Sequence, residues 1–151
     1  MRRFIRCRTS MFALLATVFF LPASATAEEF LTEAEYQMET VGKPMRGVWD
    51  GTPYTERLAA NGSVSGVSGG ASYSGKWCFG AEWDDYKKCA TLPKEAGNST
   101  APALLCVDYK DPASNGCWRI KKARDDKGIL YRYYDRNGQV VFTERVDSMG
   151  Q

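Results

Sequence analysis

Four cysteines carry the clearest chemistry in this 151-residue sequence. Ten residues separate Cys78 from Cys89, and ten also separate Cys106 from Cys117. The fifth cysteine, Cys7, lies within the predicted export signal and is removed with it. The four that remain are an even number in an exported chain, which predicts two disulfides in an oxidising compartment. A four-thiolate zinc site is the alternative, but structural zinc usually takes its ligands from C-x₂₋₄-C knuckles. Four cysteines allow three connectivities, and loop closure favours the local bridges Cys78–Cys89 and Cys106–Cys117.

Carboxylates occur as the adjacent pairs Asp84-Asp85 and Asp125-Asp126. A glycosidase needs two carboxylates that face each other at a set separation, whereas adjacent residues diverge, so turn chemistry explains both pairs better. The sequence contains no histidine, which excludes His-based triads and His-ligated metals. It also lacks an ordered calcium loop. We therefore predict no catalytic residue, no metal site and no cofactor, with Ser-Lys or carboxylate chemistry as the open alternative.

Two surface features are candidates for binding a partner. Strand alternation can place Arg119, Lys121 and Arg132 on one outer face, with Tyr134 at the same parity. Such a run is ordinarily solvated surface. The alternative is a cationic patch that binds anionic lipid, polysaccharide or an acidic protein. Trp83 lies inside the first predicted disulfide loop, where an exposed ring would be available to a partner.

The other aromatic residues are expected in the core. Trp77 and Trp118 occupy alternating positions of predicted strands, which usually fill the interior. Tyr133 and Tyr134 are consecutive, and consecutive strand residues point to opposite faces. We therefore expect one of these two rings on the outer surface.

The first 27 residues have the composition of a secretory signal peptide. They combine four arginines and no acid with an apolar run over 11–21 and the A-x-A pattern of Ala25 and Ala27. An uncleaved membrane anchor is the alternative, but the apolar run is about half of the ~20 residues that span a bilayer. We place the mature N-terminus at Glu28, so Cys7 is lost with the signal, and we predict a periplasmic or secreted protein without a transmembrane segment.

The predicted mature chain, residues 28–151, forms one domain with 16 basic and 18 acidic side chains, a net charge of 16 − 18 = −2. Nucleic-acid binders that rely on bulk positive charge need a clustered excess of Lys and Arg. The mildly acidic balance excludes that class.

The elements that position these residues are mainly strands. Thr32 and Glu35 form a capping-box pattern that predicts a short helix over 32–41. Turn signals then recur about every ten residues, apart from a polar loop over 90–102, which indicates an antiparallel meander. Eight strands are expected, at 46–49, 53–58, 63–67, 72–79, 103–109, 117–122, 129–135 and 139–146. Closure into a barrel removes the exposed strand edges, and two stacked sheets are the alternative.

Several short segments, spread over roughly 32–146, resemble a family of small exported bacterial proteins of unknown function with lipocalin-like barrels. They are Gly51 to Tyr54, Asn61-Gly62, Ser74 to Cys78, Leu105-Cys106 and Gly116 to Ile120. The resemblance implies a lipocalin-like barrel and export, and it transfers no catalytic residues. A lipocalin-like fold would imply a small-ligand pocket, although an interior filled with side chains is equally compatible with this length.

The sequence thus predicts a non-enzymatic binding protein of the bacterial envelope or extracellular space, whose partner is an envelope component, a small ligand or an extracellular protein. An inhibitor acting through the disulfide-braced Trp83 loop is the alternative. A hydrolase is the weakest reading. A cavity inside the barrel would favour ligand carriage, whereas a filled barrel with an exposed, rigid Trp83 loop would favour inhibition.

Overall fold

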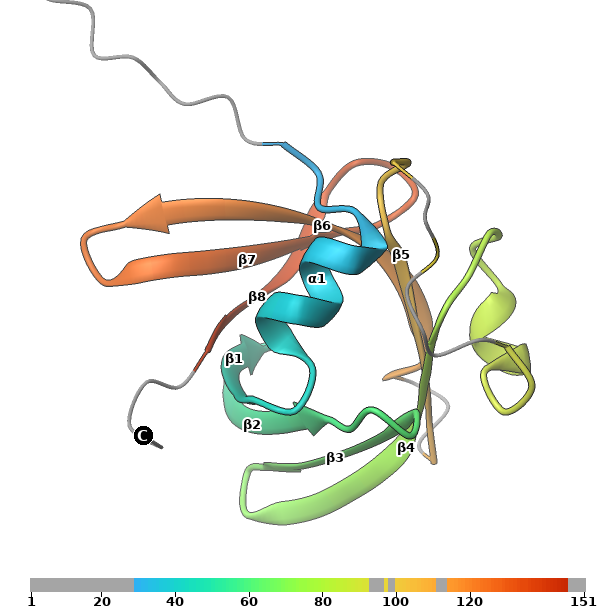
Figure 1. The fold of residues 1–151 in the computed structure, drawn as a ribbon. Coiled ribbons are helices and arrows are strands. Elements are labelled where there is room, and N and C mark those ends of the chain that lie inside the picture. The colour runs from blue at the N-terminus through green and yellow to red at the C-terminus, as the bar shows by residue number, and fades with distance from the viewer. Residues whose placement is uncertain (1–28, 93–96, 98–99, 111–113, 147–151) are drawn as a thin grey trace, which may run out of the picture.

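A computed structural model describes residues 29–92, 97, 100–110 and 114–146 (Figure 1). The predicted signal peptide, residues 1–27, and the cleavage site before Glu28 lie outside these residues. Within them, one helix precedes eight strands. The elements are α1 (Glu33–Thr40), β1 (Pro44–Trp49), β2 (Thr52–Leu58), β3 (Ser63–Ser68), β4 (Ala71–Phe79), the short 3₁₀ helix η1 (Asp85–Lys88), β5 (Leu104–Tyr109), β6 (Gly116–Asp125), β7 (Gly128–Tyr134) and β8 (Val140–Val146).

The eight strands form a closed antiparallel barrel. Each strand pairs with its neighbour in sequence, and β1 closes the ring by pairing with β8 from Met45↔Val146 to Val48↔Thr143. Closure satisfies the edges that an open sheet would leave unpaired. The prediction of a mainly β chain, closed into an eight-stranded barrel with one short N-terminal helix, is therefore confirmed.

Helix α1 lies across one end of the barrel (Figure 1). Thr32 caps it through the predicted capping box, in which the Glu35 backbone N–H donates to the Thr32 Oγ1. Tyr36 is buried and packs edge-to-face against Phe79 at the end of β4. The chain leaves the helix at Gly42, whose φ of 83° suits glycine and whose N–H donates to the Leu58 carbonyl. Helix α1 thus closes the end at which β2 and β4 finish.

The β6–β7 hairpin is longer than predicted, because β6 continues to Asp125 rather than ending at Lys122. Lys122 has the same parity as the buried Ile120, a position where a charge is normally unfavourable. Its ammonium lies 2.6 Å from the Glu39 Oε1 on α1, and this ion pair lets the strand continue past a polar residue.

The barrel core comes from alternate strand positions, as the pattern predicted. Trp77 and Trp118 are both buried in it. The Trp77 indole N–H donates to the Ala59 carbonyl at 2.8 Å, so the buried ring carries no unpaired donor. Tyr133 is buried, whereas its neighbour Tyr134 lies on the outer face, which confirms the expectation that the two rings diverge.

The disulfides lie in a second, smaller core outside the barrel. Cys78, Cys106 and Cys117 occupy paired positions on β4, β5 and β6, and Cys89 comes from the segment 80–92, which folds over them beside β4 and β5 (Figure 1). The bridges are Cys78–Cys89 and Cys106–Cys117, and the latter joins Cα atoms 4.0 Å apart. The predicted connectivity is confirmed.

No helix within the described residues is long and apolar enough to cross a membrane. The two disulfides are typical of proteins outside the reducing cytoplasm.

Candidate functional site

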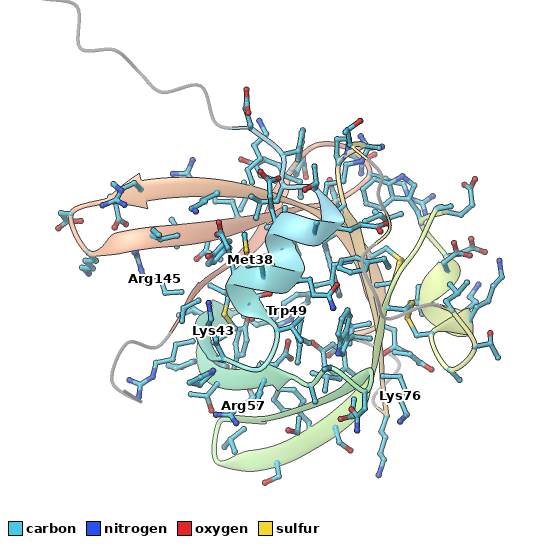
Figure 2. All side chains as sticks on the ribbon, in the orientation of Figure 1. Met38, Lys43, Trp49, Arg57, Lys76 and Arg145 are labelled. Carbon is cyan, nitrogen blue, oxygen red and sulfur yellow. A yellow bond between two sulfur atoms is a disulfide. The ribbon has the colours of Figure 1, made fainter. Side chains whose placement is uncertain are left out.

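A cavity of about 820 Å³ opens at the end of the barrel opposite α1. Its walls come from the ends of β1, β3 and β5 and from the beginnings of β2, β4, β6 and β8. Trp49, labelled in Figure 2, points into this ring of strands, whereas Lys76 points away from it. The lining residues are Trp49, Tyr54, Glu56, Ser68, Ala71, Ser72, Tyr73, Ser74, Tyr109, Lys110, Ser114, Trp118 and Phe142. The barrel is therefore packed at its α1 end and hollow at the other.

Three aromatic rings form one wall of the cavity. The Trp49 ring centroid lies 4.9 Å from that of Phe142 and 6.2 Å from that of Trp118, and Trp118 and Phe142 are 5.2 Å apart. The contacts are tilted or edge-to-face, the arrangements that aromatic pairs prefer. We call Trp49, Trp118 and Phe142 the aromatic wall.

Glu56 on β2 is the single acidic residue among those that line the cavity. Its Oε2 accepts hydrogen bonds from the Tyr109 hydroxyl at 2.7 Å and the Tyr73 hydroxyl at 3.1 Å. Oε1 accepts no hydrogen bond from the described residues. None of the described polar side-chain atoms is both buried and unpartnered, so Oε1 is open to the cavity.

A second carboxylate, Glu144 on β8, lies behind the cavity lining and is 3% exposed. Its Oε1 accepts a hydrogen bond from the Tyr54 hydroxyl at 2.8 Å, and its Oε2 accepts one from the Tyr133 hydroxyl. The Tyr133 oxygen is in turn 2.9 Å from the Tyr36 oxygen on α1. A chain of phenols and one carboxylate thus crosses the barrel from the helix to Tyr54 beside the cavity.

Within the described part of the chain, Glu56 and Glu144 are buried without a neighbouring cation, and this raises the pKa of both carboxyl groups. None of the described ion pairs involves either one. Desolvation, followed by repulsion from Glu144, raises the pKa of Glu56 to about 8, against the lowering effect of its two phenol donors. Desolvation also raises the pKa of Glu144. Burial, and the negative charge of the two acids, raise the pKa of Tyr54, Tyr73 and Tyr109, so these phenols stay protonated as donors.

Glycines opposite the phenols make room for these contacts. The register pairs Gly47 with Tyr54, Gly66 with Tyr73, and Gly75 with Tyr109. A Cβ at Gly47 or at Gly66 would overlap the end of the opposite phenol ring, and one at Gly75 would meet the backbone around Tyr109. The three tyrosines that donate to the two carboxylates from the cavity lining each face a glycine. This repeated pairing shows that the site is built into the sheet itself.

The predicted surface residues come together at the outer face of β6 and β7. Lys121 pairs with Arg132, and Arg119 pairs with Tyr134. The Lys121 ammonium lies 4.7 Å from the Phe30 ring centroid and 5.3 Å from that of Tyr134. The shared outer face is therefore present, but Lys121 already lies against two aromatic rings.

Trp83 differs from its expected setting. The ring is half-buried, packs against the disulfide cluster and carries the Arg119 guanidinium 5.7 Å from its centroid. Asp85, two residues after Trp83, is buried in the same loop and accepts hydrogen bonds from the Ala81 and Glu82 backbone N–H groups. The hydrogen bond from the Lys88 ammonium, followed by these two backbone bonds, lowers the pKa of Asp85 to about 2. Asp125 likewise accepts the Lys127 N–H in a turn, so both acids do the turn chemistry that was predicted.

Sequence reasoning missed the two buried glutamates. It looked for acids adjacent in the chain, whereas Glu56 and Glu144 come from strands far apart in sequence. Parity was the available signal, because Tyr54, Glu56 and Leu58 alternate along one face of β2 and all three are buried. A carboxylate between two inward residues marks an interior polar site.

Comparison of the chain with protein-family models, curated proteins and solved structures gave no match.

Proposed function

We propose that this protein is an exported binding protein that holds a small ligand in the barrel cavity opposite α1. The observation that carries the proposal is the cavity itself. Its volume of about 820 Å³ falls within the ~300–1,000 Å³ range of small-molecule sites. Its lining joins an aromatic wall to a few convergent polar groups, which is the usual composition of such a site. The predicted signal peptide and the two disulfides support a periplasmic or extracellular location.

Binding is favoured over hydrolysis by the placement of the acids. Glu56 lines the cavity, but Glu144 does not. A glycosidase needs two carboxylates on either side of the substrate bond. Because Glu144 lies behind the cavity wall, the two acids cannot take those positions. Inhibition through the Trp83 loop has less support than ligand binding, because the Trp83 ring packs against its own disulfide cluster. The cationic outer face has less support for a similar reason, because Arg119 and Lys121 lie over aromatic rings of the same chain.

The proposal is tested by filling the cavity. Ser68 lines it from β3, so Ser68→Trp should occupy part of its volume. Ser65 lies on the same strand, is exposed and faces outward, so Ser65→Trp is the matched control. We expect N-phenyl-1-naphthylamine, a neutral fluorescent probe, to bind the wild type and Ser65→Trp with one-to-one stoichiometry. Binding by Ser68→Trp should be at least tenfold weaker.

Circular dichroism and the thermal midpoint of both variants should stay close to those of the wild type, since both sites are at least partly open. A wild-type protein that does not take up the probe, or a folded Ser68→Trp variant that binds it unchanged, would refute the proposed site.

A further inference from the structure

The cavity has a marked charge asymmetry. Glu56 is the one acid in its lining, and Lys110, at the exposed rim, is the one base. Behind Glu56 lies the second carboxylate, Glu144, which is bound by phenols rather than by a cation. Phenols donate hydrogen bonds but bring no positive charge. The inner end of the cavity therefore presents carboxylate oxygen with no cation among the described residues to neutralise it.

The aromatic wall adds to the same preference. Aromatic faces carry negative electrostatic potential and attract ammonium groups, most strongly for tryptophan and for quaternary ammonium ligands. Two of the three wall residues, Trp49 and Trp118, are tryptophans, and Tyr73 and Tyr109 add a second edge-to-face pair 5.5 Å apart. Rings and a carboxylate in one cavity provide the two kinds of group that stabilise an organic cation.

We infer that the ligand is a small organic cation, an amine or a quaternary ammonium compound, which lies against the aromatic wall and is neutralised by Glu56. This inference rests on the proposed function and specifies its ligand class. Neutral sugars and anions are the competing classes. An anion would be repelled by the ionised form of Glu56, and a neutral ligand would gain no charge interaction with it.

Binding of a cation is then coupled to the protonation of Glu56. The groups that face this carboxyl are the phenols of Tyr73, Tyr109 and Tyr54, the Glu144 carboxyl and the rim ammonium of Lys110. Tyr133 and Tyr36 act on it through Glu144. Because the pKa of free Glu56 is raised to about 8, a cation must displace a proton at neutral pH. Affinity should therefore increase as the pH rises and level off above about pH 8.

The test compares three probes of nearly equal shape: choline, its neutral isostere 3,3-dimethylbutan-1-ol, and the anion 3,3-dimethylbutanoate. Isothermal titration and tryptophan fluorescence at pH 8.5 report binding. We expect choline to bind at least tenfold more tightly than the alcohol, and the anion to bind most weakly. Between pH 6 and pH 9 the choline affinity should rise on the order of a hundredfold, the dependence expected when only the ionised form of a group with pKa about 8 binds.

Two variants separate the charge of Glu56 from that of the whole protein. Glu56→Gln keeps an oxygen for the two phenols but removes the charge, so choline should lose most of its advantage over the alcohol, keeping only the part that the aromatic wall supplies, and should bind without pH dependence. Glu29→Gln removes an exposed carboxylate outside the cavity and should behave as the wild type. At pH 7, choline titrations in phosphate and in zwitterionic HEPES buffer should differ in their measured heat, because the wild type releases about 0.9 proton per site and the two buffers have different heats of ionisation. Glu56→Gln should release no proton and give the same heat in both buffers.

The outcomes distinguish this inference from the proposed function. If N-phenyl-1-naphthylamine binds the cavity but choline shows no advantage over the alcohol, the cation inference is wrong and the cavity still binds ligands. If choline binds with the same affinity in Glu56→Gln, Glu56 does not recognise it and the inference is wrong. If neither the naphthylamine nor choline binds, both the proposed function and the inference fail.

Discussion

Gly47 on β1 lies directly opposite Tyr54 on β2, and a Cβ at Gly47 would meet the Tyr54 phenol oxygen at 2.6 Å. The missing side chain lets the phenol lie across the neighbouring strand and reach Glu144. Gly66 does the same for Tyr73, which reaches Glu56. The glycines thus set where the phenols donate, and the phenols set which carboxylate oxygens stay open.

Gly47→Ala should displace the Tyr54 ring and weaken its bond to Glu144. Overpacking in a filled interior typically costs about 1–3 kcal/mol, and we expect a loss of that size in the free energy of unfolding, measured by urea denaturation. Val48→Ala is the control, because Val48 is the exposed next residue, and such surface changes stay within about 0.5 kcal/mol. Equal stability of the two variants would show that the glycine is not needed.

Glu56 should make stability depend on pH. Its folded-state pKa is raised to about 8 from an ordinary value of 4.5, so the folded protein holds this proton more tightly than the unfolded chain. The resulting stabilisation is complete below about pH 4.5 and is lost as the pH rises towards 8. Glu56→Gln should match the wild type at pH 5 and exceed it by on the order of 3 kcal/mol at pH 8.5.

Urea denaturation at both pH values measures this difference, and Glu29→Gln is the control for removing one exposed acid. A Glu56→Gln variant with the same advantage at pH 5 and pH 8.5 would mean that Glu56 titrates as an exposed glutamate.

The disulfide core outside the barrel should contribute to the free energy of unfolding without affecting ligand binding in the barrel interior. Removing Cys78–Cys89 by double serine substitution releases a loop of ten residues, for which chain entropy predicts a loss of about 2–3 kcal/mol. The same variant should free Trp83, which packs on that cluster, and its emission should shift to longer wavelength. Cavity binding of N-phenyl-1-naphthylamine should persist, because the cluster lies on the outer face of the barrel. Loss of probe binding in a folded variant would contradict this separation.

The cations of the outer face of β6 and β7 should contribute more to the stability of the fold than the sequence suggested. Arg119 and Lys121 lie over the rings of Trp83, Phe30 and Tyr134, and exposed cation–π contacts contribute about 0.5–1 kcal/mol each. Replacing both cations by serine removes all three contacts and should therefore lower the free energy of unfolding by about 1.5–3 kcal/mol. Lys76→Ser is the control, since Lys76 is exposed and points away from the barrel (Figure 2). An unchanged unfolding midpoint in the double variant would show that these cations are ordinary solvated surface residues.

Features that depend on neighbouring residues could be predicted from the sequence by itself. The capping box of Thr32 and Glu35, the recurrent turns and the period-two alternation need only short-range geometry, and all were found in the structure. The disulfide Cys106–Cys117 belongs with them, because a hairpin places the two residues opposite each other. Local closure entropy and strand pairing act over about ten residues, a distance that a sequence pattern records.

Tertiary structure decided what the interior does. Alternation places Glu56 and Glu144 inward, but only the pairing of β1 with β8 closes the ring and brings β2 near β8. The sequence also could not show that α1 fills one end of the barrel while the other end stays hollow. That outcome depends on how many side chains point inward at each level along the barrel axis. A cavity is the difference between the volume that the closed barrel encloses and the volume that its side chains fill. No single strand carries that quantity, so it appears only when all eight are assembled.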